Sequence, residues 1–198
     1  MNWSFHSPVR LNADERRTML PESGLVLVVG LVGSGRSTLL ELLAHLLVAE
    51  AETPLNIAYL GDEAAMSGRD IPGHFRNCPS EVRFTPKALG DGAGIRAALE
   101  SRPDAVFIDE LRNYHETRAA LDAALCGHLV CASLIGDNAD DAMKRLVMGF
   151  PELHRIASTA DLKTALRAIL VQKLEAGDGT AARLVSRKIT SWGRGSAT

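Results

Sequence analysis

The chain has 198 residues and a formal net charge of −2, with 46% hydrophobic and 23% charged residues. This length suits one domain with a sizeable core, and the lack of a basic excess argues against a nucleic-acid partner. No apolar run approaches the roughly 18 residues of a membrane span, and the first 21 residues hold no signal-peptide core. The three cysteines, Cys78, Cys126 and Cys131, lack C-x-x-C spacing. Their pattern favours reduced thiols and a cytoplasmic protein.

Strand and helix patterns alternate along most of the chain. Short apolar runs predict strands at Leu25–Gly30, Asn56–Leu60, Val82–Phe84, Ala105–Asp109, Leu129–Leu134 and Ala182–Ile189. Apolar residues at helical spacing predict helices at Ser37–Ala49, Ile95–Ser101, His115–Leu125 and Asp140–Met148. The pattern of Leu162–Leu174 favours a helix, which could continue directly into a strand. The glycine-rich segment Gly61–Gly94 favours largely irregular structure.

This alternation predicts an α/β fold, with a mainly parallel sheet and helices on both faces. We find no internal repeat and no low-complexity linker in the sequence. We therefore expect an N-terminal extension at residues 1–23, one core domain at 24–190 and a flexible tail at 191–198.

The most specific motif is GLVGSGRST, residues 30–38, which has the frame G-x-x-x-x-G-K-[ST] of a phosphate-binding loop except for Arg36. A strand pattern precedes it and a helix pattern follows, as the motif requires. Backbone amides of such a loop hold phosphates, and the Ser37 hydroxyl would bind Mg²⁺. We expect ATP or ADP to contact Gly30, Gly33, Ser34, Gly35, Arg36, Ser37 and Thr38. Arg36 keeps the positive charge, but its planar guanidinium could bind in a shifted pose or fold away onto an acid.

A second motif, PDAVFIDELR (residues 103–112), places two acids directly after an apolar strand. Ligands of an open parallel sheet bind at the carboxyl ends of its strands. We therefore expect Asp109 to bind Mg²⁺ or orient the attacking water, and Asp109 and Glu110 to be catalytic. The alternative is a strand that ends in two solvated acids.

The stretch RPDAVFIDELRNYHETRAALDAALCGHLVCASL closely resembles the Walker B region of the type II/type IV secretion and pilus-motor ATPases, of the PilT and GspE type. With the phosphate loop and ALRAILVQKL (residues 165–174), the resemblance extends from Gly24 to Ile189. It implies a RecA-like P-loop NTPase core that assembles into rings with the site between subunits. It also implies a position in the cytoplasm or at the inner membrane, through partners in a secretion or pilus platform.

The departures from the family pattern cluster at the catalytic positions. Arg36 replaces the loop lysine, Gly61 replaces a glutamate that would polarise water, and Ile135 replaces a histidine. Asn113 replaces an aspartate, and the family's E-T pair falls one position late, at Glu116 and Thr117. Glu63, which replaces a proline beside the altered Gly61, is a candidate for compensation. The positions that match are Glu110, Arg112, Gly127 and His128, and we expect His128 to be structural.

Two functions compete within this resemblance. One is a nucleotide-binding protein with weak or absent hydrolysis and a regulatory or assembly role, since three separate catalytic contributions are altered. The other is an active ATPase that energises pili, type II secretion or conjugative transfer. A small-molecule kinase fits the length but not the Walker B stretch. Because the family's rings place the site between subunits, the resemblance implies a homo-oligomer or a hetero-oligomer with a full-length secretion ATPase. Family members usually carry a separate domain before the core, whereas only 23 residues precede Gly24 here. We therefore expect one wall of the family's nucleotide cleft to come from another protein or to be absent.

Overall fold

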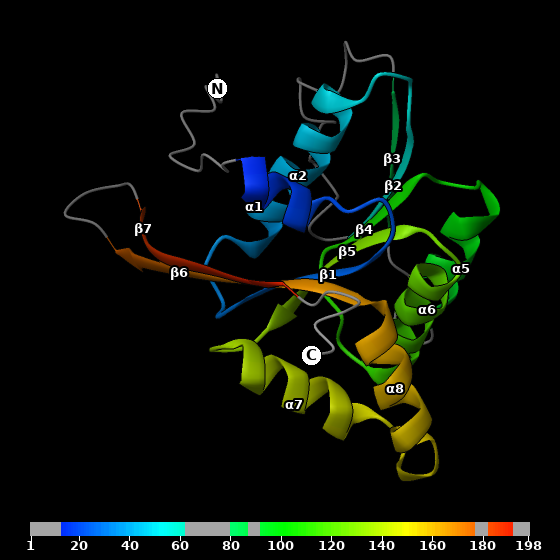
Figure 1. The fold of residues 1–198 in the computed structure, drawn as a ribbon, viewed down its shortest axis with the longest axis vertical. Coiled ribbons are helices and arrows are strands. Elements are labelled where there is room, and N and C mark those ends of the chain that lie inside the picture. Colours follow the sequence, from blue (N-terminus) through cyan, green and yellow to red (C-terminus); the bar gives the residue numbers. More distant parts are fainter. Residues whose placement is uncertain (1–12, 62–79, 87–91, 177–181, 192–198) are drawn as a thin grey trace, which may run out of the picture.

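The computed structural model describes residues 13–61, 80–86, 92–176 and 182–191. Its strands form a seven-stranded sheet with the order β3-β2-β4-β5-β1-β6-β7 (Figure 1). All neighbouring strands pair in parallel except β6 and β7, which are antiparallel. The strands are β1 (Gly24–Gly30), β2 (Asn56–Gly61), β3 (Glu81–Pro86), β4 (Ala105–Ile108), β5 (Leu129–Ile135), β6 (Leu166–Ala176) and β7 (Ala182–Ser191).

Helices cover both faces of the sheet (Figure 1). On one face, α1 (Ala13–Met19) and α2 (Arg36–Glu50) pack against alternate residues of the central strands. The other face carries α5 (Ala93–Glu100), α6 (Tyr114–Leu125), α7 (Ala139–Gly149), a 3₁₀ turn, η1 (Glu152–His154), and α8 (Arg155–Ala165). Among the described residues, no helix is both long and apolar enough to span a membrane.

Strand β1 lies inside the sheet and is buried along its whole length. Its side chains alternate between the two cores: Val26 and Val28 face the α2 side, and Leu25, Leu27 and Val29 face the α6 side. A parallel strand covered on both faces has no solvated side, so its sequence is a continuous apolar run rather than an alternating one. The run GLVLVVG therefore encodes an interior strand that is buried on both faces.

The predicted fold class is confirmed, and the structure decides one element that the sequence left open. Leu162–Leu174 is not mainly a helix, because α8 ends at Ala165 and β6 begins at Leu166. Residues of β6 from Leu166 to Val171 pair with β1, and this parallel pairing supplies the backbone hydrogen bonds that a helix would have supplied locally. The open alternative, a run into a strand, is what the structure has.

Three further elements differ from the expectations. Helix α1, within the expected extension, and the first two turns of α8 were not predicted. Strand β3 is longer than the predicted Val82–Phe84. Most of the segment Gly61–Gly94, which was expected to be irregular, lies outside the described residues. The predicted strand at Ala182–Ile189 is present as β7. The tail beyond residue 191 lies outside the described residues.

Candidate functional site

The phosphate loop, residues 30–36, connects the end of β1 to the first turn of α2. Gly33 and Gly35 both have φ of 80°, a left-handed conformation that non-glycine residues rarely adopt. The Ser34 amide donates to the Leu31 carbonyl at 3.1 Å, which closes the turn. Within the described part of the chain, the amides of Gly33, Gly35 and Arg36 have no hydrogen-bond acceptor. Free amides at a helix N-terminus form an anion site.

Gly30 shows how tightly this loop is folded. A Cβ at Gly30 would lie 2.2 Å from Ser34 Oγ and 2.7 Å from the Gln172 carbonyl oxygen. At Gly33, by contrast, a Cβ would meet nothing within 4 Å. The base of the loop is therefore closed by protein, while the loop remains open at Gly33. Leu31 and Val32, at the tip, are exposed.

Asp109 and Glu110 lie at the same edge of the sheet as the phosphate loop. Asp109 follows β4 directly, and the C-terminal ends of β1, β4 and β5 share one edge because these strands are parallel. Its backbone is held on both sides: the amide donates to the Leu60 carbonyl at 2.8 Å, and its carbonyl accepts from the Ser133 hydroxyl. Asp109 Oδ1 is buried and has no hydrogen-bond partner within the described residues. Glu110 pairs with Arg112 at 3.2 Å.

Arg36 connects the loop and these acids electrostatically. Partial burial lowers the pKa of its guanidinium, while the nearby Glu110 and Asp109 carboxylates act in the opposite direction. Both acids therefore favour the charged form of Arg36. The side chain does not pair with either acid: Arg36 Nη1 donates to the Gly30 carbonyl at 2.8 Å. The cation is thus held against the base of its own loop.

The altered family positions lie at the same edge. Gly61 ends β2, next to β4, and Ile135 ends β5, opposite Gly30 of β1. Ile135 also lines a cleft of about 280 Å³ next to Glu110. The larger hollow, about 690 Å³, is lined by α1 and by Glu50 at the other end of α2, away from the loop. Glu63 and Cys78 lie outside the described residues.

A capping arrangement that we did not expect holds the chain after β4. Asn113 is the N-cap of α6, and its side-chain oxygen accepts the Glu116 amide at 3.0 Å. The buried Glu116 carboxylate reaches back to the Arg112 amide at 2.8 Å, and the Thr117 hydroxyl donates to the Asn113 carbonyl. Asn-x-x-Glu is a capping signal that the sequence contained. Glu116 therefore holds this loop in place.

Gln172 is a second residue that sequence reasoning did not single out. Its side-chain Nε2 donates to the Ser34 carbonyl at 2.6 Å across 138 residues of sequence. Both residues are buried. The only sequence signal was its place in the ALRAILVQKL element, which carries no chemistry by itself.

His128 lies against the end of α6, with its Nδ1 3.2 Å from the Ala123 carbonyl oxygen. It lies before β5, and its carbonyl accepts the Gly24 amide at the N-terminal edge of the sheet. It is therefore remote from the loop. The free loop amides, the Arg36 cation and the Asp109 and Glu110 carboxylates lie at one edge of the sheet. Such a set would fit a phosphate chain with a hydrated Mg²⁺.

Comparisons with known proteins place this site in context. The sequence profile of the family described as "Type II/IV secretion system protein" matches residues 10–178. The uncharacterized protein YggR of Escherichia coli (strain K12) is 36% identical over 172 residues, which is 80% of this chain and 48% of that protein. The type IV pilus retractation ATPase PilT of Pseudomonas aeruginosa is 29% identical over 158 residues, 76% of this chain and 42% of that protein.

Solved structures match as well. The crystal structure of the pilus retraction motor PilT with bound ADP has a TM-score of 0.76 and 25% identity, and the match covers 93% of this chain and 52% of that one. The ATPase DotB of Legionella pneumophila has a TM-score of 0.77 at 23% identity, covering 92% of this chain and 49% of that one, and supports the fold alone. The chain spans about half, or less, of each of these relatives.

Proposed function

This chain belongs to the type II/IV secretion system protein family, and we propose that it binds ATP or ADP with Mg²⁺ at the phosphate loop but turns it over slowly. Its role is then regulatory or in assembly rather than that of a motor. The observation that carries the proposal is the position of the Arg36 guanidinium, which donates to the Gly30 carbonyl within its own loop.

Binding is supported by the open amides of the loop and by the relative that holds ADP. The amides of Gly33, Gly35 and Arg36 would take phosphate oxygens, and the N-terminus of α2 adds its positive dipole end. The Ser37 hydroxyl and the Asp109 carboxylate would hold Mg²⁺, which neutralises phosphate charge when bound. Asp109 Oδ1 is buried and has no hydrogen-bond partner among the described residues. It is suited to that task because a buried oxygen without a partner is costly.

Slow turnover is supported by what the edge of the sheet lacks. A lysine in the loop delivers a compact charge to the phosphates, whereas the Arg36 guanidinium is held by a carbonyl. Gly61 and Ile135 supply neither a base nor a charge at the ends of β2 and β5. Loss of one preorganised electrostatic group typically costs roughly 10²–10³ in rate. We propose Glu110, Asp109 and Glu63 as the remaining catalytic candidates.

Assembly is the third part of the proposal. The relatives are about twice as long as this chain, and the matched region is one part of each. We propose that the chain forms a homo-oligomer, or a hetero-oligomer with a full-length secretion ATPase, through surfaces that flank the phosphate loop. Such a complex would reach a secretion or pilus platform at the inner membrane through its partners, with the chain itself cytoplasmic.

The test measures phosphate release from ATP by the purified protein. ADP binding is measured separately, in the presence and absence of Mg²⁺. We expect binding that weakens in Ser37→Ala, and phosphate release far below about 1 s⁻¹, towards the low end of ordinary enzymes. Glu110→Gln is the background control. Wild-type turnover near that value, abolished in Glu110→Gln, would instead establish an active ATPase, the role that the retained Asp109 and Glu110 favour.

Restoring the family residues separates the contributions. Arg36→Lys should improve ADP affinity more than turnover, because Gly61 and Ile135 would still supply no catalytic group. The triple change Arg36→Lys, Gly61→Glu and Ile135→His should raise turnover more than any single change, since catalytic groups act as a unit. A single change that restores the full rate would contradict the proposal that three contributions were lost.

A further inference from the structure

The carbonyl of Ser34 lies in a position where the fold leaves it without a helical partner. The first backbone hydrogen bond of α2 runs from the Leu39 amide to the Gly35 carbonyl, one residue further along. Ser34 is 6% exposed, so water cannot take its carbonyl freely. A buried carbonyl without a donor is costly, and Gln172 supplies the donor at 2.6 Å. The conformation of the loop centre therefore depends on a side chain from a distant strand.

Gln172 occupies the point at which β6 leaves the body of the sheet. The pairing of β6 with β1 ends at Val171, opposite Val29. Beyond it, β6 pairs only with β7 in the described part of the sheet. This two-stranded hairpin extends past the edge from which the phosphate loop leaves (Figure 1). Gln172 is thus the first residue of β6 beyond its pairing with β1, where the β6–β7 hairpin projects from the sheet.

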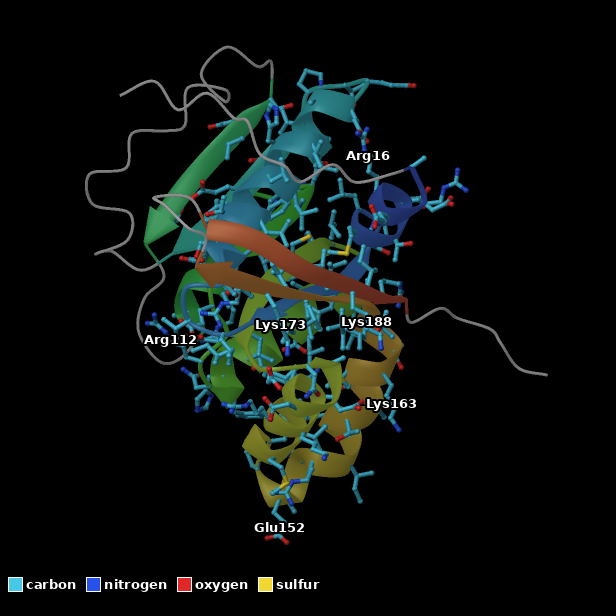
Figure 2. All side chains as sticks on the ribbon, turned by 90° about the vertical axis from the view of Figure 1, so that its left-hand side faces the viewer. Arg16, Arg112, Glu152, Lys163, Lys173 and Lys188 are labelled. Carbon is cyan, nitrogen blue, oxygen red and sulfur yellow. The ribbon has the colours of Figure 1, made fainter. Side chains whose placement is uncertain are left out.

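The next residue fixes the base of the hairpin to a second loop. Lys173 Nζ pairs with Asp137 at 2.8 Å, in the segment that follows β5. In that segment, the Gly136 amide donates to the Gly30 carbonyl at 3.3 Å, the same oxygen that Arg36 contacts. Lys173 is labelled in Figure 2, where it lies beside the strands β6 and β7. Consecutive residues of β6 therefore contact both segments that border the site.

We propose that Gln172 is a positioning residue, which holds the phosphate loop in its anion-binding shape from the base of the β6–β7 hairpin. It touches no phosphate and acts only through Ser34. Of the two contacts from β6, the one from Gln172 is buried and the one from Lys173 is exposed. Exposed ion pairs contribute little. The control of loop shape therefore lies with Gln172.

The matched test uses Gln172→Met, which keeps the length of the side chain and removes the donor, beside Lys173→Met as the control. Amide exchange by NMR in the nucleotide-free protein is the first readout, because it does not depend on nucleotide binding. We expect protection of the Ser34 amide to fall about three- to tenfold in Gln172→Met, the range for one intramolecular hydrogen bond. Protection in β1 and in Lys173→Met should stay as in the wild type.

The affinity for ADP with Mg²⁺ is the second readout, and it rests on the proposed function. It should fall in Gln172→Met and stay at the wild-type value in Lys173→Met. If wild-type protein binds no ADP, the proposed function fails, while the exchange of Ser34 still decides the role of Gln172.

Two results would overturn the proposal: unchanged exchange at Ser34, or a loss of protection spread equally through β1. Should Gln172→Met not fold, Gln172→Leu replaces it, since leucine has no donor for the Ser34 carbonyl, and the same outcomes apply.

Discussion

Replacement of Gly30 by alanine tests how tightly the base of the phosphate loop is packed. The added Cβ would lie 2.2 Å from Ser34 Oγ, which can rotate away, and 2.7 Å from the Gln172 carbonyl oxygen, which belongs to the backbone of β6. The backbone contact cannot be relieved by a rotamer change, so β1 and β6 must separate or the loop must shift. Overpacking of this kind costs about 1–3 kcal/mol of unfolding free energy.

For a chain of this length, each kcal/mol corresponds to about 2–4 °C in Tm. We therefore expect Gly30→Ala to lower the Tm by several degrees, and to weaken the binding of ADP further because the loop itself is displaced. Differential scanning calorimetry and an ADP titration measure the two effects.

Two glycines serve as controls for this prediction. At Gly149, the last residue of α7, a Cβ would meet nothing within 4 Å, so Gly149→Ala should be neutral or slightly stabilising. At Gly33 there is also open space, but φ is 80°, so alanine there tests backbone strain without a clash. A Gly30→Ala protein with the stability and ADP affinity of the wild type would refute the packing argument.

Three other measurements test separate features. Asn113→Ala should lower the free energy of unfolding by about 1 kcal/mol through loss of the α6 N-cap, whereas Asn113→Asp should retain the cap; equal losses in chemical denaturation would contradict this. Burial raises the pKa of the Cys131 thiol. Cys131 should therefore resist a thiol reagent in the native protein, while the exposed Cys126 reacts. Rapid labelling of both cysteines would be inconsistent with the buried position of Cys131. The hydrogen bond from Lys173 lowers the pKa of Asp137. This pair therefore stabilises the fold above the unfolded pKa of about 3.9, and the stabilisation is lost as the pH falls through the lowered folded pKa. NMR titration should show a higher Asp137 pKa in Lys173→Met.

Local patterns were sufficient for the half of the site that lies between β1 and α2. A continuous apolar run, three glycines and a helical repeat are contiguous in the chain, so the loop and its neighbours follow from short-range geometry alone. The placement of Asp109 was also within reach, because an acid after a buried parallel strand must lie at the carboxyl edge of the sheet. The capping by Asn113 and Glu116 could have been predicted too, since its signal is four residues long.

Other features depended on partners distant in sequence. The apolar run of β6 fits a helix or a strand equally well, and pairing with β1 decided between them. Helix α1 has seven residues, too few to be stable without the packing of Met19 into the core.

The same division applies to Arg36 and Gln172. The sequence by itself determined that a cation other than lysine would stand in the loop, but not that the cation would bond to the Gly30 carbonyl. Nor does any local pattern indicate that Ser34 needs a donor from a residue 138 positions away. Composition and periodicity report only on residues that are near one another in the sequence. A buried carbonyl, by contrast, accepts a hydrogen bond from whichever strand the topology brings beside it, and only the tertiary structure decided that this strand is β6.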